Sequence, residues 1–143
     1  MLKKIIIYKY KNFKKKINKI INLEKKIINK INYIFCNNKY ILYINNKFLN
    51  KKYYTDTITF NYNNKNNNYK LFGDIFISVD QVYNNSKIWK VKFSREMKRV
   101  IIHSILHLIG YNDNNLINRN YMKYKENFYI KKLNNIIIKY ENI

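Results

Sequence analysis

The residues best suited to chemistry gather in one short segment, HSILHLIGYND at 103–113. It contains both histidines of the chain and one of its two glycines. Histidines four residues apart lie on one face of a helix, with Cβ atoms roughly 5–6 Å apart. Neutral imidazoles at that separation can both bind one ion at about 2.0–2.1 Å, the usual Zn–N distance. The spacing of His103 and His107 therefore predicts a metal chelate.

A third ligand is predicted just beyond this helix. Gly110 permits the left-handed backbone that ends many helices, so the chain can turn and bring Asp113 back to the same ion. A carboxylate oxygen suits zinc, and the dipole of the helix favours a cation at its C-terminus by about 0.3–1 kcal/mol. The sequence thus predicts one Zn²⁺ ion held by His103, His107 and Asp113, which would also be the catalytic residues.

Two other interpretations use the same segment. In the first, His103 and His107 are hydrogen-bonded core residues and Asp113 is an ordinary turn residue after glycine. In the second, the segment belongs to a metallopeptidase. That chemistry needs Glu directly after the first histidine as general base, and Ser104 stands there. The peptidase alternative is disfavoured, whereas the purely structural alternative stays open.

The segment HSILHLIGYND resembles the HGxLHLxGYDH motif of the YbeY family of rRNA-maturation endoribonucleases. TDTITF at 55–60, GDIFIS at 73–78 and EMKRVII at 96–102 extend the resemblance, which covers about residues 30 to 132. It implies that His103 and His107 are the first two zinc ligands, with Asp113 in the third position, where most relatives have histidine. It also implies a zincin-like α+β fold, hydrolysis of single-stranded RNA, maturation of the 16S rRNA 3′ end and ribosome quality control.

The sequence departs from the family pattern at two places. Ser104 replaces the glycine beside the first ligand, a small change that a helix tolerates. The loop FLNKKYYTD at 48–56 is shorter than in many relatives and offers Lys51 and Lys52 where those relatives carry Arg. Lysine supplies charge without the bidentate fork of arginine. We therefore expect Lys51, Lys52 and Arg99 as candidate contacts to RNA phosphate.

The expected chemistry is metal-assisted phosphodiester hydrolysis, in which the ion lowers the pKa of bound water to roughly 7 and basic side chains offset the developing charge. Asp56 and Asp74 are expected to be structural, at strand or turn positions. The rival hypothesis is a ribosome-assembly factor that binds RNA or a ribosomal protein and uses its metal only to hold the fold. Three protein ligands would favour catalysis and four would favour a structural ion.

The elements that must position this site follow from apolar periodicity. Strands are expected at 4–10, 31–36, 55–62 and 71–79, and helices at 13–29, 40–48, 80–88, 95–109 and 121–133. The third and fourth strands suggest a hairpin. The long helix should begin at a Ser94 cap and pack through Met97, Ile101, Ile105 and Leu108, opposite the histidines. Residues 1–143 are thus expected to form one α+β domain: a mixed sheet of about four strands with packed helices, and a metal site where the long helix ends.

The amino-acid composition indicates which kinds of binding partner to expect. The net charge of +21 is carried almost entirely by Lys, in a chain without Pro, a composition typical of a nucleotide bias towards A and T, so the charge by itself does not establish a function. A body this basic nevertheless attracts phosphates, and we expect ribosomal RNA and the small ribosomal subunit as partners, with a ribosomal protein as a further candidate. Lys or Asn interrupts every apolar stretch, so no membrane association is expected and a cytoplasmic location is predicted. Cys36, the only cysteine, is expected to be a buried thiol.

Overall fold

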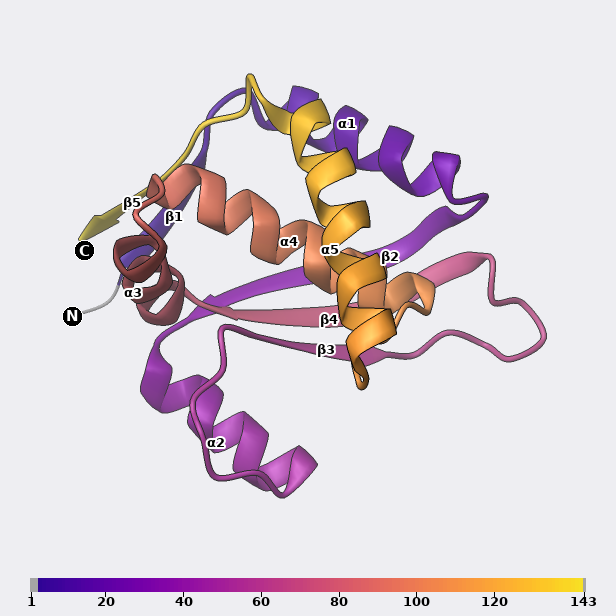
Figure 1. Ribbon diagram of the computed structural model, residues 1–143. Coiled ribbons are helices and arrows are strands. Elements are labelled where there is room, and N and C mark those ends of the chain that lie inside the picture. The colour runs from indigo at the N-terminus through magenta and orange to yellow at the C-terminus, as the bar shows by residue number, and fades with distance from the viewer. Residues whose placement is uncertain (1–2, 143) are drawn as a thin grey trace.

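The computed structural model describes residues 3–142, whose strands form two sheets (Figure 1). In the three-stranded sheet, β4 (Lys70–Ser78) is central, β2 (Ile27–Cys36) pairs with it in parallel and β3 (Thr57–Asn61) pairs with it antiparallel. The α+β class, the mixed sheet and the β3–β4 hairpin are confirmed. The second sheet is an antiparallel pair of β1 (Lys3–Ile7) and β5 (Ile138–Asn142).

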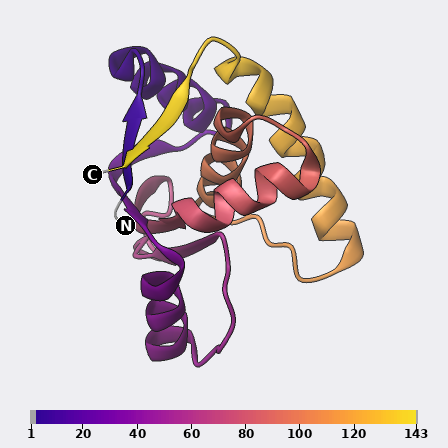
Figure 2. The same ribbon diagram turned by 90° about the vertical axis from the view of Figure 1, so that its left-hand side faces the viewer.

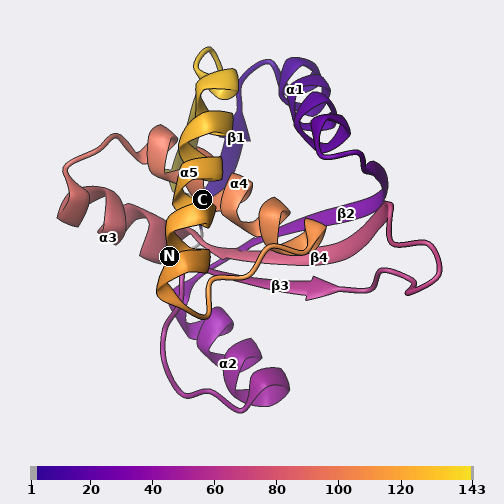
Figure 3. The same cartoon turned by 45° about the vertical axis from the view of Figure 1, so that its right-hand side comes forward.

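Helices cover both faces of the three-stranded sheet. They are α1 (Tyr10–Leu23), α2 (Asn38–Leu49), α3 (Val79–Trp89), α4 (Phe93–Ile109) and α5 (Leu116–Ile130), followed by a 3₁₀ turn at Lys131–Leu133. In Figures 1 and 3, α1, α4 and α5 lie on one side of this sheet and α2 lies on the other. Among the described residues, no helix is both long and apolar enough to cross a bilayer.

The central strand β4 shows why the sheet is covered twice. Leu71, Ile75 and Ile77 are fully buried in the main core with α4 and α1, because alternate residues of a strand point to one face. Phe76 points to the opposite face and packs against a smaller core that includes Ile41 of α2. The free Cys36 borders this second core and is half-buried, with burial as the main reason that the pKa of its thiol is raised to about 12.

The boundaries of α1 and β2 differ from the sequence-based expectation. The helix ends at Leu23, and Lys25 then adopts a left-handed φ of 58° that turns the chain into β2. Ile27 and Ile28 therefore belong to the strand, although their spacing continued the helical period. A short apolar run fits both periods, so periodicity alone did not separate them.

The start of α5 and the strand β5 were also missed. The helix begins at Leu116, where Asn115 accepts a hydrogen bond from the backbone of Asn118 as an N-cap. Leu116 and Ile117 are 65% and 80% exposed, so this first turn has no buried face that a periodicity analysis would detect. In β5, Ile138 is the only fully buried side chain, which is too weak an alternation to indicate a strand.

The long helix α4 is confirmed, but its cap is not Ser94. Lys92 is the N-cap residue and makes no side-chain cap, whereas Ser94 Oγ accepts a hydrogen bond from Ile138 N at 2.9 Å. Ser94 therefore fastens β5 to α4. The predicted packing face is confirmed, since Met97, Ile101, Ile105 and Leu108 are all within 1% of complete burial.

The approach of α4 to the hairpin depends on Gly73. A Cβ built on Gly73 would meet the backbone oxygen of Phe60 and would lie 2.6 Å from Leu108 Cδ1. We predict that Gly73→Ala lowers the free energy of unfolding by about 1–3 kcal/mol, the usual cost of overpacking. Urea denaturation measures this, with Asn84→Ala on exposed α3 surface as the control. Equal stability of the two variants would show that the backbone relaxes freely at Gly73.

Candidate metal centre

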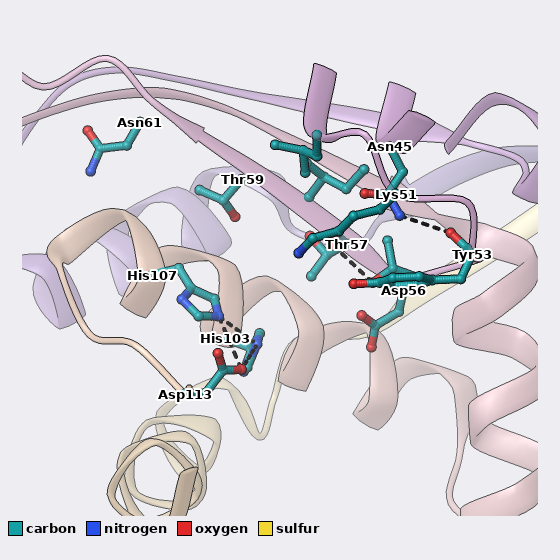
Figure 4. Close-up of a pocket in the computed structure, with 13 residues that line it drawn as sticks. Asn45, Lys51, Tyr53, Asp56, Thr57, Thr59, Asn61, His103, His107 and Asp113 are labelled. Carbon is teal, nitrogen blue, oxygen red and sulfur yellow. Dashed lines mark hydrogen bonds and ion pairs between the residues drawn. The ribbon is translucent and has the colours of Figure 1, made fainter. Parts of the chain in front are cut away.

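The three side chains predicted to hold a metal converge at the C-terminal end of α4. His103 Nε2 and His107 Nε2 lie 3.0 Å apart, and Asp113 Oδ2 lies 3.6 Å from the first and 3.5 Å from the second. One ligand atom from each residue falls within 4.8 Å of the others. Figure 4 shows the three side chains pointing toward one another, with Thr57 and Thr59 of β3 across the cavity. This geometry is compatible with a single ion.

The hydrogen bonds of the two Nδ1 atoms determine whether each Nε2 atom has a lone pair free for a metal. His107 Nδ1 lies 3.0 Å from the backbone oxygen of Tyr111, which can only accept, so Nδ1 carries the proton. His103 Nδ1 lies 3.0 Å from Glu126 Oε2 and donates to that carboxylate. In their neutral forms, both rings then direct an Nε2 lone pair at the same point. Two lone pairs cannot hydrogen-bond to each other, so their approach fits atoms that share a cation.

The lowered pKa values of His107 and Glu126 favour the deprotonated forms that metal binding needs. Burial, together with the nearby His103, lowers the pKa of His107 despite the raising effects of Asp113 and the Tyr111 carbonyl. Burial by itself would raise the pKa of Glu126, but the hydrogen bond from His103 and the charge of Arg99 outweigh burial and lower the pKa below its ordinary value, so the carboxylate is ionised. A ligating histidine that donates its second N–H to a carboxylate is held in one tautomer and becomes a stronger ligand.

Arg99 lies behind this ligand shell and holds its carboxylates. Its guanidinium contacts Glu96 at 2.7 Å, Glu126 at 3.1 Å and Asp56 at 3.3 Å. Burial lowers the pKa of Arg99, yet the three carboxylates outweigh it and raise the pKa above its ordinary value. Glu126 is therefore positioned by Arg99 and in turn positions His103. With these partners in place, a contact from Arg99 to RNA phosphate stays a prediction.

The turn that brings Asp113 back to the histidines is stabilised by contacts of Tyr111 with residues outside α4. Gly110 has a φ of 127°, which permits the chain to leave α4 sharply, as the sequence predicted. Tyr111 then donates its hydroxyl to Glu24 at 2.9 Å, and Lys125 Nζ contacts the same carboxylate at 3.0 Å. Lys125 Nζ also lies 5.4 Å from the Tyr111 ring centroid. The loop that carries Asp113 is thus tied to the C-cap residue of α1 and to α5.

Ser104, which stands where the family has glycine, joins α4 to β3. Its hydroxyl is fully buried and donates to the Val100 carbonyl at 2.8 Å. The Thr57 hydroxyl lies 2.7 Å from Ser104 Oγ and donates to it, since Ser104 has already used its proton. The substitution therefore adds a contact between the helix that carries the histidines and the strand across the cavity.

The cavity in front of the ligands has a volume of about 460 Å³ and includes only some of the predicted RNA contacts. Lys51 lines it, whereas Lys52 is not among its lining residues. The buried Asn45 anchors this loop, because its backbone oxygen accepts from Lys51 N at 3.1 Å and its amide donates to the Tyr53 carbonyl at 2.9 Å. The sequence offered no distinction between the two lysines.

The two aspartates expected to be structural lie in different places. Asp56 lines the cavity in front of the ligands, where Arg99 holds its carboxylate, so it lies closer to the site than expected. Asp74 accepts hydrogen bonds from Asn32 at 2.9 Å and from Tyr62 at 3.1 Å on the sheet, as a structural residue would.

Sequence reasoning missed Glu126 and Glu24. One signal pointed to them: acidic residues number only eight in the chain, so each is informative in the way that the scarce histidines were. Glu126 also lies on α5 far along the sequence from His103, and only the tertiary packing of α5 on α4 brings the two together.

The fold and the side-chain geometry define an α+β protein with a candidate metal centre at the end of the longest described helix. A family model described as "Endoribonuclease YbeY" matches residues 3–134. The chain belongs to the YbeY family.

Individual relatives agree with this assignment. Endoribonuclease YbeY of Karelsulcia muelleri is 46% identical over 127 residues, which cover 89% of this chain and 88% of the relative. Endoribonuclease YbeY of Cytophaga hutchinsonii is 42% identical over 110 residues, covering 77% and 76%. The solution structure of a protein from Thermotoga maritima aligns with a TM-score of 0.64 and 27% identity, over 86% of this chain and 79% of that one.

Glu126 provides a test of how the ligand shell is built. We predict that Glu126→Gln weakens zinc binding by about 10- to 100-fold, the usual effect of removing a carboxylate behind a ligating histidine. Competition with a chromophoric chelator measures the affinity, and circular dichroism checks the fold. Glu141→Gln, on exposed β5, is the control. Unchanged zinc affinity in Glu126→Gln would mean that the carboxylate does not act on the metal centre.

Proposed function

We propose that this protein is a single-strand-specific, metal-dependent endoribonuclease that acts in 16S rRNA 3′ end maturation and ribosome quality control in the cytoplasm. The observation that carries the proposal is the convergence of His103 Nε2, His107 Nε2 and Asp113 Oδ2 at one point of a cavity that Lys51 also lines. Membership of a family whose relatives are named endoribonucleases supports RNA as the substrate.

The number of ligands favours catalysis over a structural metal. The cluster found among the described residues contains His103, His107 and Asp113 and no fourth side chain. Catalytic zinc sites have three protein ligands and keep a position open for water or substrate, whereas structural sites are closed by four. The ligand chemistry of two imidazoles and one carboxylate fits zinc, which we propose as the ion, one per chain. The alternative of a non-catalytic assembly factor is therefore disfavoured.

The chemistry divides between the ion and the residues of the chain. Bound zinc would lower the pKa of a water molecule to about 7 and polarise a phosphate oxygen. Glu126 and the Tyr111 carbonyl hold the two imidazoles with Nε2 toward the reacting centre. Lys51, which lines the same cavity, would attract the phosphate and offset the charge that develops in the transition state.

The overall charge of +21 supports a polyanionic substrate, and we propose ribosomal RNA of the small subunit as that substrate, with a ribosomal protein as a further partner. Binding of single-stranded RNA should then depend on salt. Each neutralised phosphate is expected to contribute about −0.7 to the slope of log K against log salt concentration. A slope near zero in anisotropy titrations of an RNA oligonucleotide would remove phosphate attraction from the proposal.

Asp113→Asn is the variant that separates a metal ligand from a turn residue. Asparagine keeps the size and the turn propensity of aspartate but removes its charge. We predict that Asp113→Asn loses most bound zinc and most RNA cleavage, as His103→Ala and His107→Ala should. Elemental analysis of untagged protein and a cleavage assay with and without chelator measure both. Zinc content and cleavage equal to the parent protein would contradict the three-ligand site.

Lys51 and Lys52 form a matched pair, because they are neighbours of equal charge and only Lys51 lines the cavity. We predict that Lys51→Ala slows cleavage by about tenfold or more, as the loss of a charge-assisted contact to phosphate would, with zinc content unchanged. Lys52→Ala should stay within about twofold of the parent protein, a difference of less than 1 kcal/mol. Equal effects of the two substitutions on cleavage would show that position in the cavity does not matter.

A further inference from the structure

The metal centre borders a second cavity. His103 and Asp113 line both the cavity that contains Lys51 and another, of about 440 Å³, where α3, α4 and α5 meet. Figure 2 shows these three helices grouped on one side of the molecule. The second cavity includes no residue of β3 or of the loop that carries Lys51. The three ligands therefore lie between two cavities formed by different parts of the fold.

Scarce residues of the chain gather around this second cavity. Arg95, Arg99 and Arg119 are the only three arginines among the 29 basic residues, Trp89 is the only tryptophan, and all four line it. Lysine is the abundant basic residue here and suffices wherever charge alone is needed. Arginine additionally offers a planar fork that binds a phosphate with two hydrogen bonds. Because carboxylates hold Arg99, the arginines left for a ligand are Arg95 and Arg119.

The available groups come from three helices and share the cavity rim. Trp89 is at the end of α3 and 67% exposed, Arg95 is in the first turn of α4, and Arg119 is in the first turn of α5. Both arginines are exposed, and within residues 3–142 neither side chain has a hydrogen bond or ion pair. Lys123 adds a further charge one turn after Arg119. An exposed indole beside exposed guanidinium groups suits a strand with flat bases and a charged backbone.

We propose that this second cavity is a nucleotide-binding subsite for the RNA strand on one side of the scissile phosphate. Arg95 and Arg119 bind its phosphates, and Trp89 stacks on one of its bases. This inference rests on the proposed endoribonuclease function. Since Lys51 lies in the other cavity, a strand that occupies both cavities passes over His103 and Asp113 and continues in both directions. Such a site cleaves within a strand and does not require a chain end.

Trp89 reports on the subsite directly, because all tryptophan emission of the protein comes from it. The probe is a uridine oligonucleotide added to metal-free protein in chelator, so that the RNA stays intact. We expect saturable quenching of the emission by the single strand and little by the same strand annealed to its complement, whose bases are already stacked and paired. Binding detected by anisotropy of the labelled oligonucleotide without any change in emission would overturn the proposal.

Substitutions test whether the arginines act by position or by charge alone. Arg95→Ala with Arg119→Ala should weaken binding about tenfold or more and reduce the salt slope by about 1.4, two phosphates at about 0.7 each. The control is Lys15→Ala with Lys19→Ala, which removes the same charge from exposed positions of α1 that line neither cavity. Equal losses of affinity in the two double variants would overturn the subsite.

Trp89→Ala should weaken binding about fivefold or more, the loss of one base stacked on an aromatic side chain. Affinity equal to that of the parent protein would overturn the assignment of Trp89. A zinc-loaded parent protein that binds RNA through Trp89 and cleaves none would instead contradict the proposed function and leave the subsite standing. Cleavage by the parent protein, with emission and variant affinities unchanged, would contradict the subsite alone.

Discussion

The structure around the site depends on one constraint: two neutral imidazoles on one helix face must point their lone pairs at the same place. Helical spacing brings His103 and His107 together, but each ring can still present either nitrogen. The hydrogen bonds at Nδ1 determine which nitrogen carries the proton: Glu126 accepts from Nδ1 of His103, and the Tyr111 carbonyl accepts from Nδ1 of His107. The hydrogen bonds behind the rings therefore give the pair the tautomers that a chelate requires.

The same hydrogen bonds join α5 to α4. Glu126 must lie behind His103 as a buried carboxylate, and a buried charge is costly unless it is paired. Arg99, one helical turn before His103 on the same face, supplies the charge and is itself held by Glu96 and Asp56. The ion pairs thus connect α4, α5 and the segment before β3, so that the ligand shell and the tertiary packing stabilise each other.

The sequence was sufficient for whatever depends on local spacing. It predicted that His103, His107 and Asp113 converge, that the chain turns at Gly110 and that one face of α4 is buried, because each follows from helical geometry over a few residues. The sequence was insufficient where contacts between residues far apart in the chain determine the partner of a side chain. Ser94 bonds to β5 instead of capping α4, and Glu126 approaches His103 only through the packing of α5. Of Lys51 and Lys52, Lys51 alone lines the cavity, and its loop is held by contacts with Asn45 of α2.

Because the chain has only two histidines, the tautomer of each imidazole ring can be measured directly. Nitrogen-15 NMR of the labelled imidazoles can assign the protonated nitrogen of each ring before and after addition of one equivalent of Zn²⁺ to untagged protein. The account predicts that His103 and His107 both carry their proton on Nδ1, and that both Nε2 resonances shift on zinc binding while Nδ1–H is retained. A proton on Nε2 of either ring in the zinc-loaded protein, or an Nε2 resonance unmoved by zinc, would contradict it.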